Sequence, residues 1–270
     1  MSFLEVRQRT NTAPANICIY CGSTKNLTDE HVVPFALGGN LVIPKASCKS
    51  CAKITSLLEG KILRGFMFDA RIAGNFPTSH PQNRPSAVSV GIRPKYRLRF
   101  KKVDIPSSEA VGVIFLPTFE RATFLVGKPP ITGIHIMGTE VIGFGKNLKD
   151  ISTQYKGEAM QFTQSIPAHD FVRFLAKIGY CYAVASIGPY PLNEVPVLDL
   201  ILGKDDCDGT YVGSADYRIE AEINKPLHAL GLNWVSGIYG GEAIKILFSQ
   251  VKLFAGSGAK GYEVVVRKPA

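Results

Sequence analysis

Two short cysteine pairs constrain this chain more than any other feature. They read Cys18-Ile19-Tyr20-Cys21 and Cys48-Lys49-Ser50-Cys51 in a chain of 270 residues. Two C-x-x-C pairs at this separation predict one tetrahedral zinc site, because each pair presents two thiolates to the same ion across a short turn. A segment this small cannot bury enough apolar surface to be stable alone, so we expect a structural Zn²⁺ to supply part of its folding free energy.

The remaining composition indicates an ordinary globular protein in a reducing compartment. Apolar residues make up 46% of the chain and charged residues 20%. Cys181 and Cys207 lie far apart without a pairing pattern, so we expect reduced thiols and bound metal rather than disulfides. The first ten residues are too polar for a secretory signal and no apolar stretch reaches spanning length, which predicts a cytoplasmic protein with no membrane partner.

The positive charge is concentrated in the first part of the chain. Residues 1–103 hold 16 Lys and Arg against 5 Asp and Glu, whereas residues 104–270 hold 15 against 17. A generally basic surface would not be confined in this way. The distribution therefore predicts a polyanionic partner, DNA in the first place with RNA as the alternative, bound through its phosphates.

Candidate phosphate contacts fall in two groups of basic residues. The first surrounds the second cysteine pair and the sequence after it: Lys45, Lys49, Lys53, Arg64 and Arg71. The second belongs to the alternating segment 95–101, where Lys95, Arg97 and Arg99 are expected on one face of a strand. The same charges can instead protect an exposed edge strand from aggregation.

The pattern along the chain predicts an α+β protein with two parts. A basic arm and a zinc-bound unit occupy residues 1–75, a linker with three prolines occupies 76–86, and a mixed α+β domain occupies 87–270. We expect a helix over 52–71 and a long buried helix that begins at an N-cap Ser165 and ends at Gly188. Strands are expected at 111–116, 122–126, 131–137, 243–248, 251–255 and 262–267.

The residues between the cysteine pairs carry a resemblance to a known family. They include Asp29-Glu30-His31-Val32-Val33-Pro34 in a predicted hairpin, followed by Leu37-Gly38-Gly39. In this order, and flanked by the two cysteine pairs, these features resemble the zinc-stapled members of the HNH endonuclease family over residues 18–59. The resemblance implies a small ββα-metal, treble-clef-like unit that hydrolyses phosphodiester bonds of DNA.

The resemblance also implies roles for the acidic-histidine pair. His31 would be the general base toward water, which suits an imidazole that is neutral near pH 7. Glu30 would help to bind a catalytic Mg²⁺ or another divalent cation through oxygen. The alternatives are a structural or zinc-binding histidine and a solvated carboxylate, with Asp29 as a second acidic candidate. Neighbouring strand residues point to opposite faces, so a shared site requires a local departure from a flat strand.

The sequence departs from the family pattern after the second cysteine pair. Ala52 stands where members carry Asn or His, and no Asn occurs in residues 43–47. Asn40 is the nearest candidate for the central catalytic Asn, although Asn is also common in turns. Glu59 can complete a variant metal site if its helix face points at His31, and otherwise is a solvated helical glutamate.

These features leave three classes of function. The first is a metal-dependent DNA endonuclease, in which residues 104–270 supply sequence preference or control. The second is a catalytically degenerate, zinc-dependent nucleic-acid-binding protein. The third is a structural zinc module that tethers the C-terminal domain to a larger assembly. Nothing in the sequence indicates an oligomeric state.

Overall fold

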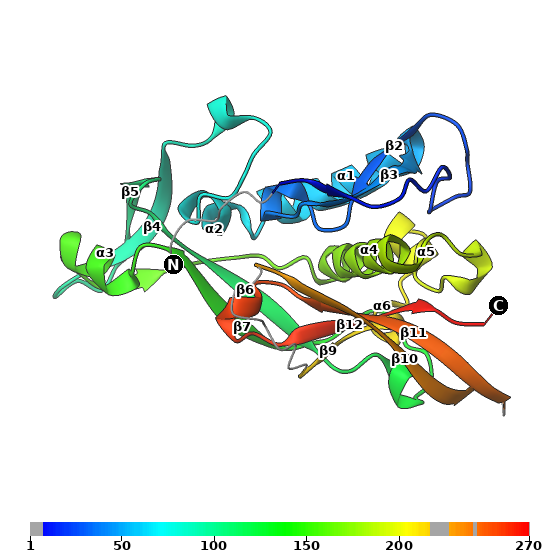
Figure 1. Ribbon diagram of the computed structural model, residues 1–270. Helices are drawn as coiled ribbons and strands as arrows, with labels where there is room; N and C mark the ends of the chain where they lie inside the picture. Colours follow the sequence, from blue (N-terminus) through cyan, green and yellow to red (C-terminus); the bar gives the residue numbers. More distant parts are fainter. Residues whose placement is uncertain (1–7, 217–226, 240–241, 270) are drawn as a thin grey trace.

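The computed structural model describes residues 8–216, 227–239 and 242–269 and has the expected α+β architecture. Three layers stack in Figure 1: the N-terminal zinc-binding elements, a central helix α4, and a twisted antiparallel sheet. A smaller lobe extends to one side of this stack. Among the described residues, no helix is long and apolar enough to cross a membrane.

The N-terminal layer is a ββα unit. Strand β2 (Leu27–His31) pairs antiparallel with β3 (Leu41–Cys48), and α1 (Lys49–Arg64) begins directly after Cys48. A short strand β1 (Thr10–Asn11) joins the outer side of β3 in parallel. Residues 1–7 of the expected basic arm lie outside the described residues. We call residues 18–64 the zinc unit.

Two glycines shape the turn between β2 and β3. This turn contains the 3₁₀ helix Phe35–Leu37, which ends at Gly38 with a positive φ of 82°. A Cβ atom on Gly39 would lie 1.9 Å from the carbonyl oxygen of Val33, so no side chain fits there. The Gly-Gly pair therefore brings β3 back tightly against the end of β2.

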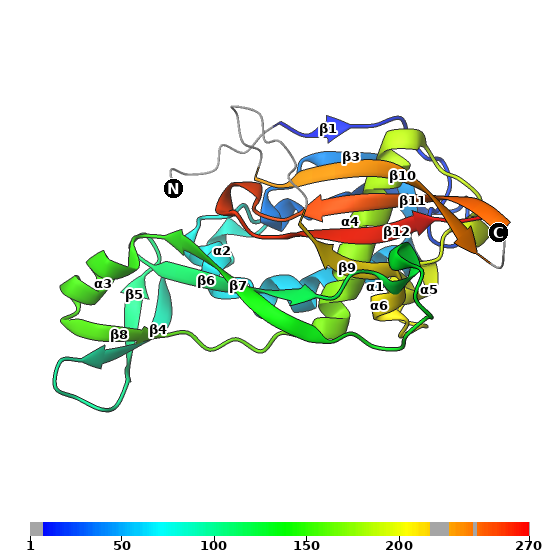
Figure 2. The ribbon, with the colours of Figure 1, turned by 90° about the horizontal axis from the view of Figure 1, so that it is seen from below.

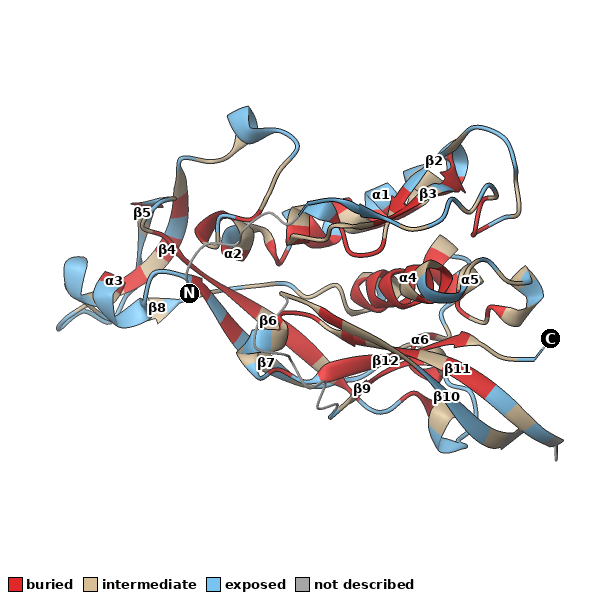
Figure 3. Ribbon diagram, viewed as in Figure 1, coloured by how far each residue is buried: buried red, intermediate tan, exposed pale blue. Residues whose placement is uncertain are grey.

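The central helix α4 (Ala168–Ile187) is buried along most of its length, as Figure 3 shows. A helix that packs on two sides needs apolar residues around most of its circumference, and its sequence provides them. One face contacts the zinc unit, for example through the rings of Tyr20 and Tyr180, whose centroids are 6.1 Å apart. The opposite face approaches strand β12 (Gly261–Arg267) at Gly179, where a Cβ atom would lie 2.9 Å from Cβ of Val264. The prediction of a buried helix ending at Gly188 is confirmed.

The third layer is an antiparallel sheet with strand order β10-β11-β12-β9. Its outer long strands, β10 (Ala229–Tyr239) and β11 (Glu242–Lys252), form an extended hairpin, and β9 (Val212–Ala215) closes the other edge. Two short helices, α5 (Leu198–Leu202) and α6 (Asp208–Tyr211), connect α4 to this sheet. Figure 2 shows α4 crossing the sheet strands.

A side lobe follows the zinc unit in the sequence. Helix α2 (Phe68–Ala73) packs against the hairpin of β6 (Val111–Phe119) and β7 (Ile136–Gly145). Beyond it lies a small sheet of order β5-β4-β8 with helix α3; the bounds are Ala87–Pro94 for β4, Lys101–Pro106 for β5, Gly157–Gln161 for β8 and Leu148–Gln154 for α3. A second, smaller apolar core around Ile92 and Ile105 fills this lobe.

Several sequence expectations about local structure are wrong. The helix predicted over 52–71 is broken at Gly65 into α1 and α2. Residues 95–100 are the loop between β4 and β5, not a strand, because Tyr96 adopts a positive φ of 62° and turns the chain. Residues 122–126 form a 3₁₀ turn, β7 begins only at Ile136, and Pro167 rather than Ser165 caps α4.

The apolar core does not divide at the expected linker, residues 76–86. One continuous cluster includes Ile19 and Leu37 of the zinc unit together with Phe174 of α4 and Val264 of β12. Phe76, the first residue of the expected linker, is itself buried in this cluster. The division into 1–75, 76–86 and 87–270 stays a prediction about modules in the sequence, which in the folded chain share a core.

Candidate active site and zinc centre

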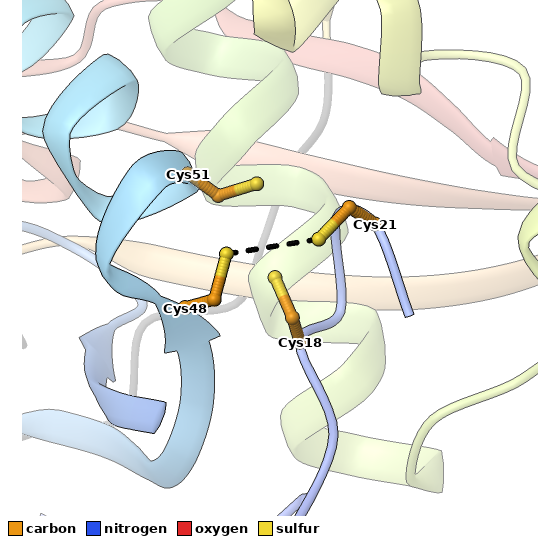
Figure 4. A group of neighbouring side chains, drawn as sticks. All are labelled: Cys18, Cys21, Cys48 and Cys51. Carbon is orange, nitrogen blue, oxygen red and sulfur yellow. Dashed lines mark hydrogen bonds between the residues drawn. The ribbon is translucent and has the colours of Figure 1, made fainter. Parts of the chain in front are cut away.

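The four cysteines of the two C-x-x-C pairs converge on one point, as Figure 4 shows. The sulfur atoms of Cys18, Cys21, Cys48 and Cys51 all lie within 4.8 Å of one another, and those of Cys21 and Cys48 are 3.7 Å apart. Four thiolates around one Zn²⁺ at about 2.3 Å would be separated by about 3.8 Å. The cluster is therefore compatible with a structural zinc ion held by these four side chains.

The start of helix α1 favours a thiolate in this cluster. Cys48 is the N-cap residue of α1, so its sulfur lies near the backbone N–H groups of the first helical turn, including that of Cys51. Interaction with the backbone of Cys51, with burial opposing it, lowers the pKa of the Cys48 thiol to about 7. A thiolate at the first turn of a helix is the form that a zinc ion requires.

The acidic-histidine pair lies at the opposite end of the same hairpin, where β2 is irregular. The register between β2 and β3 shifts between Thr28 and Glu30, so that Asp29 bulges out of the ladder. Asp29 forms an ion pair with Arg9 and accepts a hydrogen bond of 3.1 Å from the backbone of Lys45. The bulge precedes Glu30, whereas Glu30 and His31 pair in regular register with Ile43 and Val42, so these two side chains stay on opposite faces of the strand. The bulge leaves Asp29 with structural partners.

Glu30 and Glu59 are brought together, with a lysine between them. Nζ of Lys177 lies 2.8 Å from Oε1 of Glu30 and 2.9 Å from Oε1 of Glu59. The same ammonium donates a hydrogen bond to the backbone carbonyl of His31. Glu30 is 6% exposed and Lys177 is fully buried. We call Glu30, Glu59 and Lys177 the lysine triad.

The triad residues perturb one another's protonation. Burial raises the pKa of Glu30, and the neighbouring ammonium opposes that change. Burial alone would lower the pKa of Lys177, but the carboxylates of Glu30 and Glu59 outweigh it, so its pKa is raised and the amine remains protonated. A divalent ion does not fit between Glu30 and Glu59 while this ammonium occupies the position. The role of these two residues as ligands of a catalytic cation stays a prediction.

His31 faces a pocket on the surface of the zinc unit. The pocket has a volume of about 480 Å³ and is lined by the imidazole, by Glu59 and by basic side chains from three segments: Arg64, Arg71, His80 and Arg84. Burial and the positive charge of Lys177 lower the pKa of His31. The ring is therefore neutral at pH 7, in the state that accepts a proton.

Asn40 is engaged away from the imidazole. Its side-chain amide donates a hydrogen bond of 3.0 Å to the carbonyl of Gln8, next to strand β1. Among the residues that line the pocket beside His31, Asn40 does not occur. Its catalytic role stays a prediction without support from this contact.

The predicted phosphate contacts separate into three places. Arg64 and Arg71 line the pocket beside His31, and Arg71 also binds the carbonyls of Ala36 and Leu63 at 2.8 Å. A second set is exposed on the zinc unit outside that pocket: Lys45, Lys49 and Lys53. The third set, Lys95, Arg97 and Arg99, is exposed on the β4–β5 loop at the lower left of Figure 2.

Sequence reasoning missed Lys177, and it also missed His80 and Arg84 in the pocket. A signal for Lys177 was present, since it is the one charged residue in the otherwise apolar stretch 174–185 of a helix that was predicted to be buried. A buried lysine needs anionic partners, so its position called for carboxylates elsewhere in the chain. His80 and Arg84 lie in the proline-rich segment that was expected to be a linker.

The zinc unit therefore combines a ββα fold, four clustered cysteines and a histidine at the end of strand β2. In a comparison with protein families, residues 18–57 match the model of a family described as HNH endonuclease. Neither the curated proteins nor the solved structures gave a match to the chain. The matched residues lie within the zinc unit, and an HNH unit implies a nucleic-acid substrate.

Proposed function

We propose that the zinc unit hydrolyses phosphodiester bonds of DNA, with His31 as the general base. The observation that carries the proposal is the position of a neutral imidazole in a pocket whose other ionisable groups are mostly basic. A phosphodiester is an anion, and the guanidinium groups of Arg64 and Arg84 would attract it to the same pocket. The match of residues 18–57 to the HNH endonuclease family supports the same reaction class.

In the proposed reaction His31 takes a proton from a water molecule, and the water oxygen attacks the phosphorus. A P–O bond of the diester breaks, the leaving oxygen takes a proton from solvent, and the products are a phosphate monoester and an alcohol. The arginines balance the negative charge that grows on the phosphoryl oxygens. The zinc at the cysteine cluster holds the fold and takes no part in these steps.

The test is cleavage of plasmid DNA by zinc-loaded, full-length protein. Reactions with Mg²⁺, Mn²⁺ or Ni²⁺ are compared with a reaction without added divalent ion, which also tests dependence on a catalytic cation. We expect His31→Ala to lower the cleavage rate by at least about 100-fold, as for loss of a general base. His135→Ala is the matched control, because His135 is exposed and lies outside the His31 pocket. Equal rates for the two variants would reject the proposal.

The second candidate is a catalytically degenerate module that binds DNA or RNA. Two observations favour it: Ala52 follows the second cysteine pair, and an ammonium occupies the place between Glu30 and Glu59. Such a module would shift labelled DNA in a gel in a salt-dependent manner without cutting it under any metal condition. Experiments on purified protein would also give the oligomeric state and any preference for DNA over RNA. The location of the protein in cells would test the predicted cytoplasmic localisation.

A further inference from the structure

The acidic residues of the zinc unit are neutralised from outside that unit. Glu30 comes from strand β2 and Glu59 from helix α1, whereas Lys177 comes from the middle of α4. The ammonium lies 2.8 and 2.9 Å from the two carboxylates and donates to the carbonyl of His31. Three oxygens of the zinc unit therefore surround one nitrogen that belongs to the other part of the chain.

Helix α4 is fixed in the position that makes this contact. Tyr180 donates a hydrogen bond of 2.6 Å to the carbonyl of Ile19, and Cys181 contacts the hydroxyl of Tyr20 at 3.2 Å. Residues three and four positions apart share one face of a helix, so Lys177, Tyr180 and Cys181 all face the zinc unit. Both partner residues, Ile19 and Tyr20, lie inside the first cysteine pair. These contacts hold the helix backbone around Lys177 beside the first cysteine pair.

An ammonium and a divalent ion compete for the same place here. A divalent cation binds carboxylate oxygens at about 2.0–2.6 Å, so an ion shared by Glu30 and Glu59 would overlap the nitrogen that lies between them. Lysine also provides three N–H groups, and if it left this position the buried carboxylate of Glu30 and the partly buried carboxylate of Glu59 would lose their cation. The charge that the acidic pair requires is present within the chain.

We propose that the ammonium of Lys177 is the cation bound by Glu30 and Glu59 in the folded protein, so that these two carboxylates do not hold a divalent ion. Lys177 also positions His31. Lys177 acts through the backbone carbonyl of His31 and through the carboxylates, and it does not contact substrate because it is fully buried. A metal ion used in cleavage would bind at a different place in the His31 pocket. The statement that Lys177 positions a catalytic residue deepens the proposed function and rests on it. The statement that Glu30 and Glu59 hold no divalent ion does not.

The experiment measures Mn²⁺ binding to zinc-loaded, full-length protein by electron paramagnetic resonance. For the wild type we expect the same Mn²⁺ affinity as for the double variant Glu30→Gln, Glu59→Gln. For Lys177→Ala we expect one additional Mn²⁺ site, at least about tenfold tighter than any wild-type site, because two carboxylates then surround a space of ion size. The additional site should vanish when Glu30→Gln and Glu59→Gln are combined with Lys177→Ala.

Controls separate this result from general damage to the fold. Lys61→Ala removes another lysine that bridges the zinc unit and α4, through Asp170 at 3.2 Å, and should add no Mn²⁺ site. Lys177→Arg keeps the positive charge and should also add none. If Lys177→Ala does not fold, the comparison of wild type with Glu30→Gln still decides the question. A wild-type Mn²⁺ site that Glu30→Gln removes would overturn the proposal.

These outcomes do not depend on catalysis. Mn²⁺ binding can be measured in a protein that cuts no DNA, so an absence of cleavage would reject the proposed function and leave the assignment of Lys177 intact. A wild-type metal site at Glu30, together with metal-dependent cleavage, would keep the function and reject the assignment.

Discussion

The zinc unit contains two polar clusters that are built in opposite ways. The four cysteines of the zinc centre come from two turns of one short segment, and zinc binding requires no side chain from elsewhere. The lysine triad takes its two carboxylates from the same segment but its cation from α4. A cluster made within one motif can be recognised from that motif. A cluster completed from a distant helix cannot be recognised in this way, even when two of its three residues have been named.

Among the substitutions that test this comparison, loss of a cysteine should have the largest effect on zinc content and stability. Cys48→Ser removes one zinc ligand and the N-cap thiolate of α1, and zinc binding contributes on the order of 10 kcal/mol to folding of such units. We expect loss of bound zinc, measured by atomic absorption, and loss of the cooperative thermal transition, because the zinc unit shares its core with α4. Cys207→Ser, outside the cluster, should retain zinc and the transition. A folded, zinc-free Cys48→Ser would show that the unit needs no metal.

Loss of the lysine should be the next largest effect. Lys177→Met leaves the buried carboxylate of Glu30 and the partly buried carboxylate of Glu59 without a cation, and breaking a buried pair in this way costs about 3–5 kcal/mol. We expect that decrease in the free energy of unfolding, measured in urea, with zinc still bound. Lys61→Met breaks an exposed ion pair with Asp170 and should cost less than about 1 kcal/mol. Equal decreases in the free energy of unfolding for Lys177→Met and Lys61→Met would show that the lysine triad stabilises the fold no more than an exposed ion pair does.

A histidine makes another contact between the two parts of the chain. Nε2 of His228 donates 2.8 Å to the carbonyl of Leu37, and Nδ1 accepts from the backbone N–H of Phe254 at 3.2 Å. Burial lowers the pKa of His228 to about 4, while the bond to Leu37 opposes the change. In the unfolded chain His228 has its usual pKa of about 6.5, so it binds a proton at a higher pH there than in the folded protein.

The expected consequence is a loss of stability in acid. The contribution of His228 is complete above about pH 7 and falls as the pH drops toward 4, by at most about 3 kcal/mol. Urea unfolding at pH 7.5, 6 and 5 measures it. His228→Gln keeps a donor to Leu37 without a titratable ring and should flatten this part of the profile, whereas His135→Gln should not. Parallel profiles for His228→Gln and wild type would contradict the assignment.

The smallest predicted effect concerns the loop at 95–100. Tyr96 is 88% exposed and Leu98 is 93% exposed, and the loop also carries Arg97 and Arg99. If it binds DNA phosphates, Arg97→Ala with Arg99→Ala should reduce the slope of log affinity against log salt by about 0.9 for each phosphate that is no longer neutralised. Lys204→Ala, an exposed lysine paired with Asp199, is the control. An unchanged slope would limit the nucleic-acid contacts to the zinc unit.

Whether an element can be predicted from the sequence depends on how far apart in the chain its interacting residues lie. The cysteine pairs, the Gly-Gly turn, β2, β3 and the stop of α4 at Gly188 depend on residues close in sequence, and they were predicted. Residues 95–100 of the strand predicted at 95–101 form a loop, because alternating charge cannot reveal the positive φ of Tyr96. Strand β10 was missed because pairing with β11 stabilises it, while its own sequence is interrupted by Gly231 and Gly237.

The same distinction applies within the candidate site. His31, Glu30 and Glu59 were named from the sequence; the structure joins Glu30 and Glu59 through Lys177 and places His31 and Glu59 in one pocket. Their surroundings were not predictable, since Lys177, His80 and Arg84 reach the site through tertiary packing. Asn40 was chosen because it directly follows the glycine turn, and its amide instead donates to the carbonyl of Gln8, which precedes strand β1.

The shared core also has a consequence for the order in which the protein is made. Synthesis begins at the N-terminus, so both cysteine pairs and both acidic residues leave the ribosome well before α4. Until that helix arrives, the nascent zinc unit can bind its metal but exposes an apolar face and an acidic pair without a counter-ion. The binding of a cation by Glu30 and Glu59 would therefore differ between the growing chain and the finished protein.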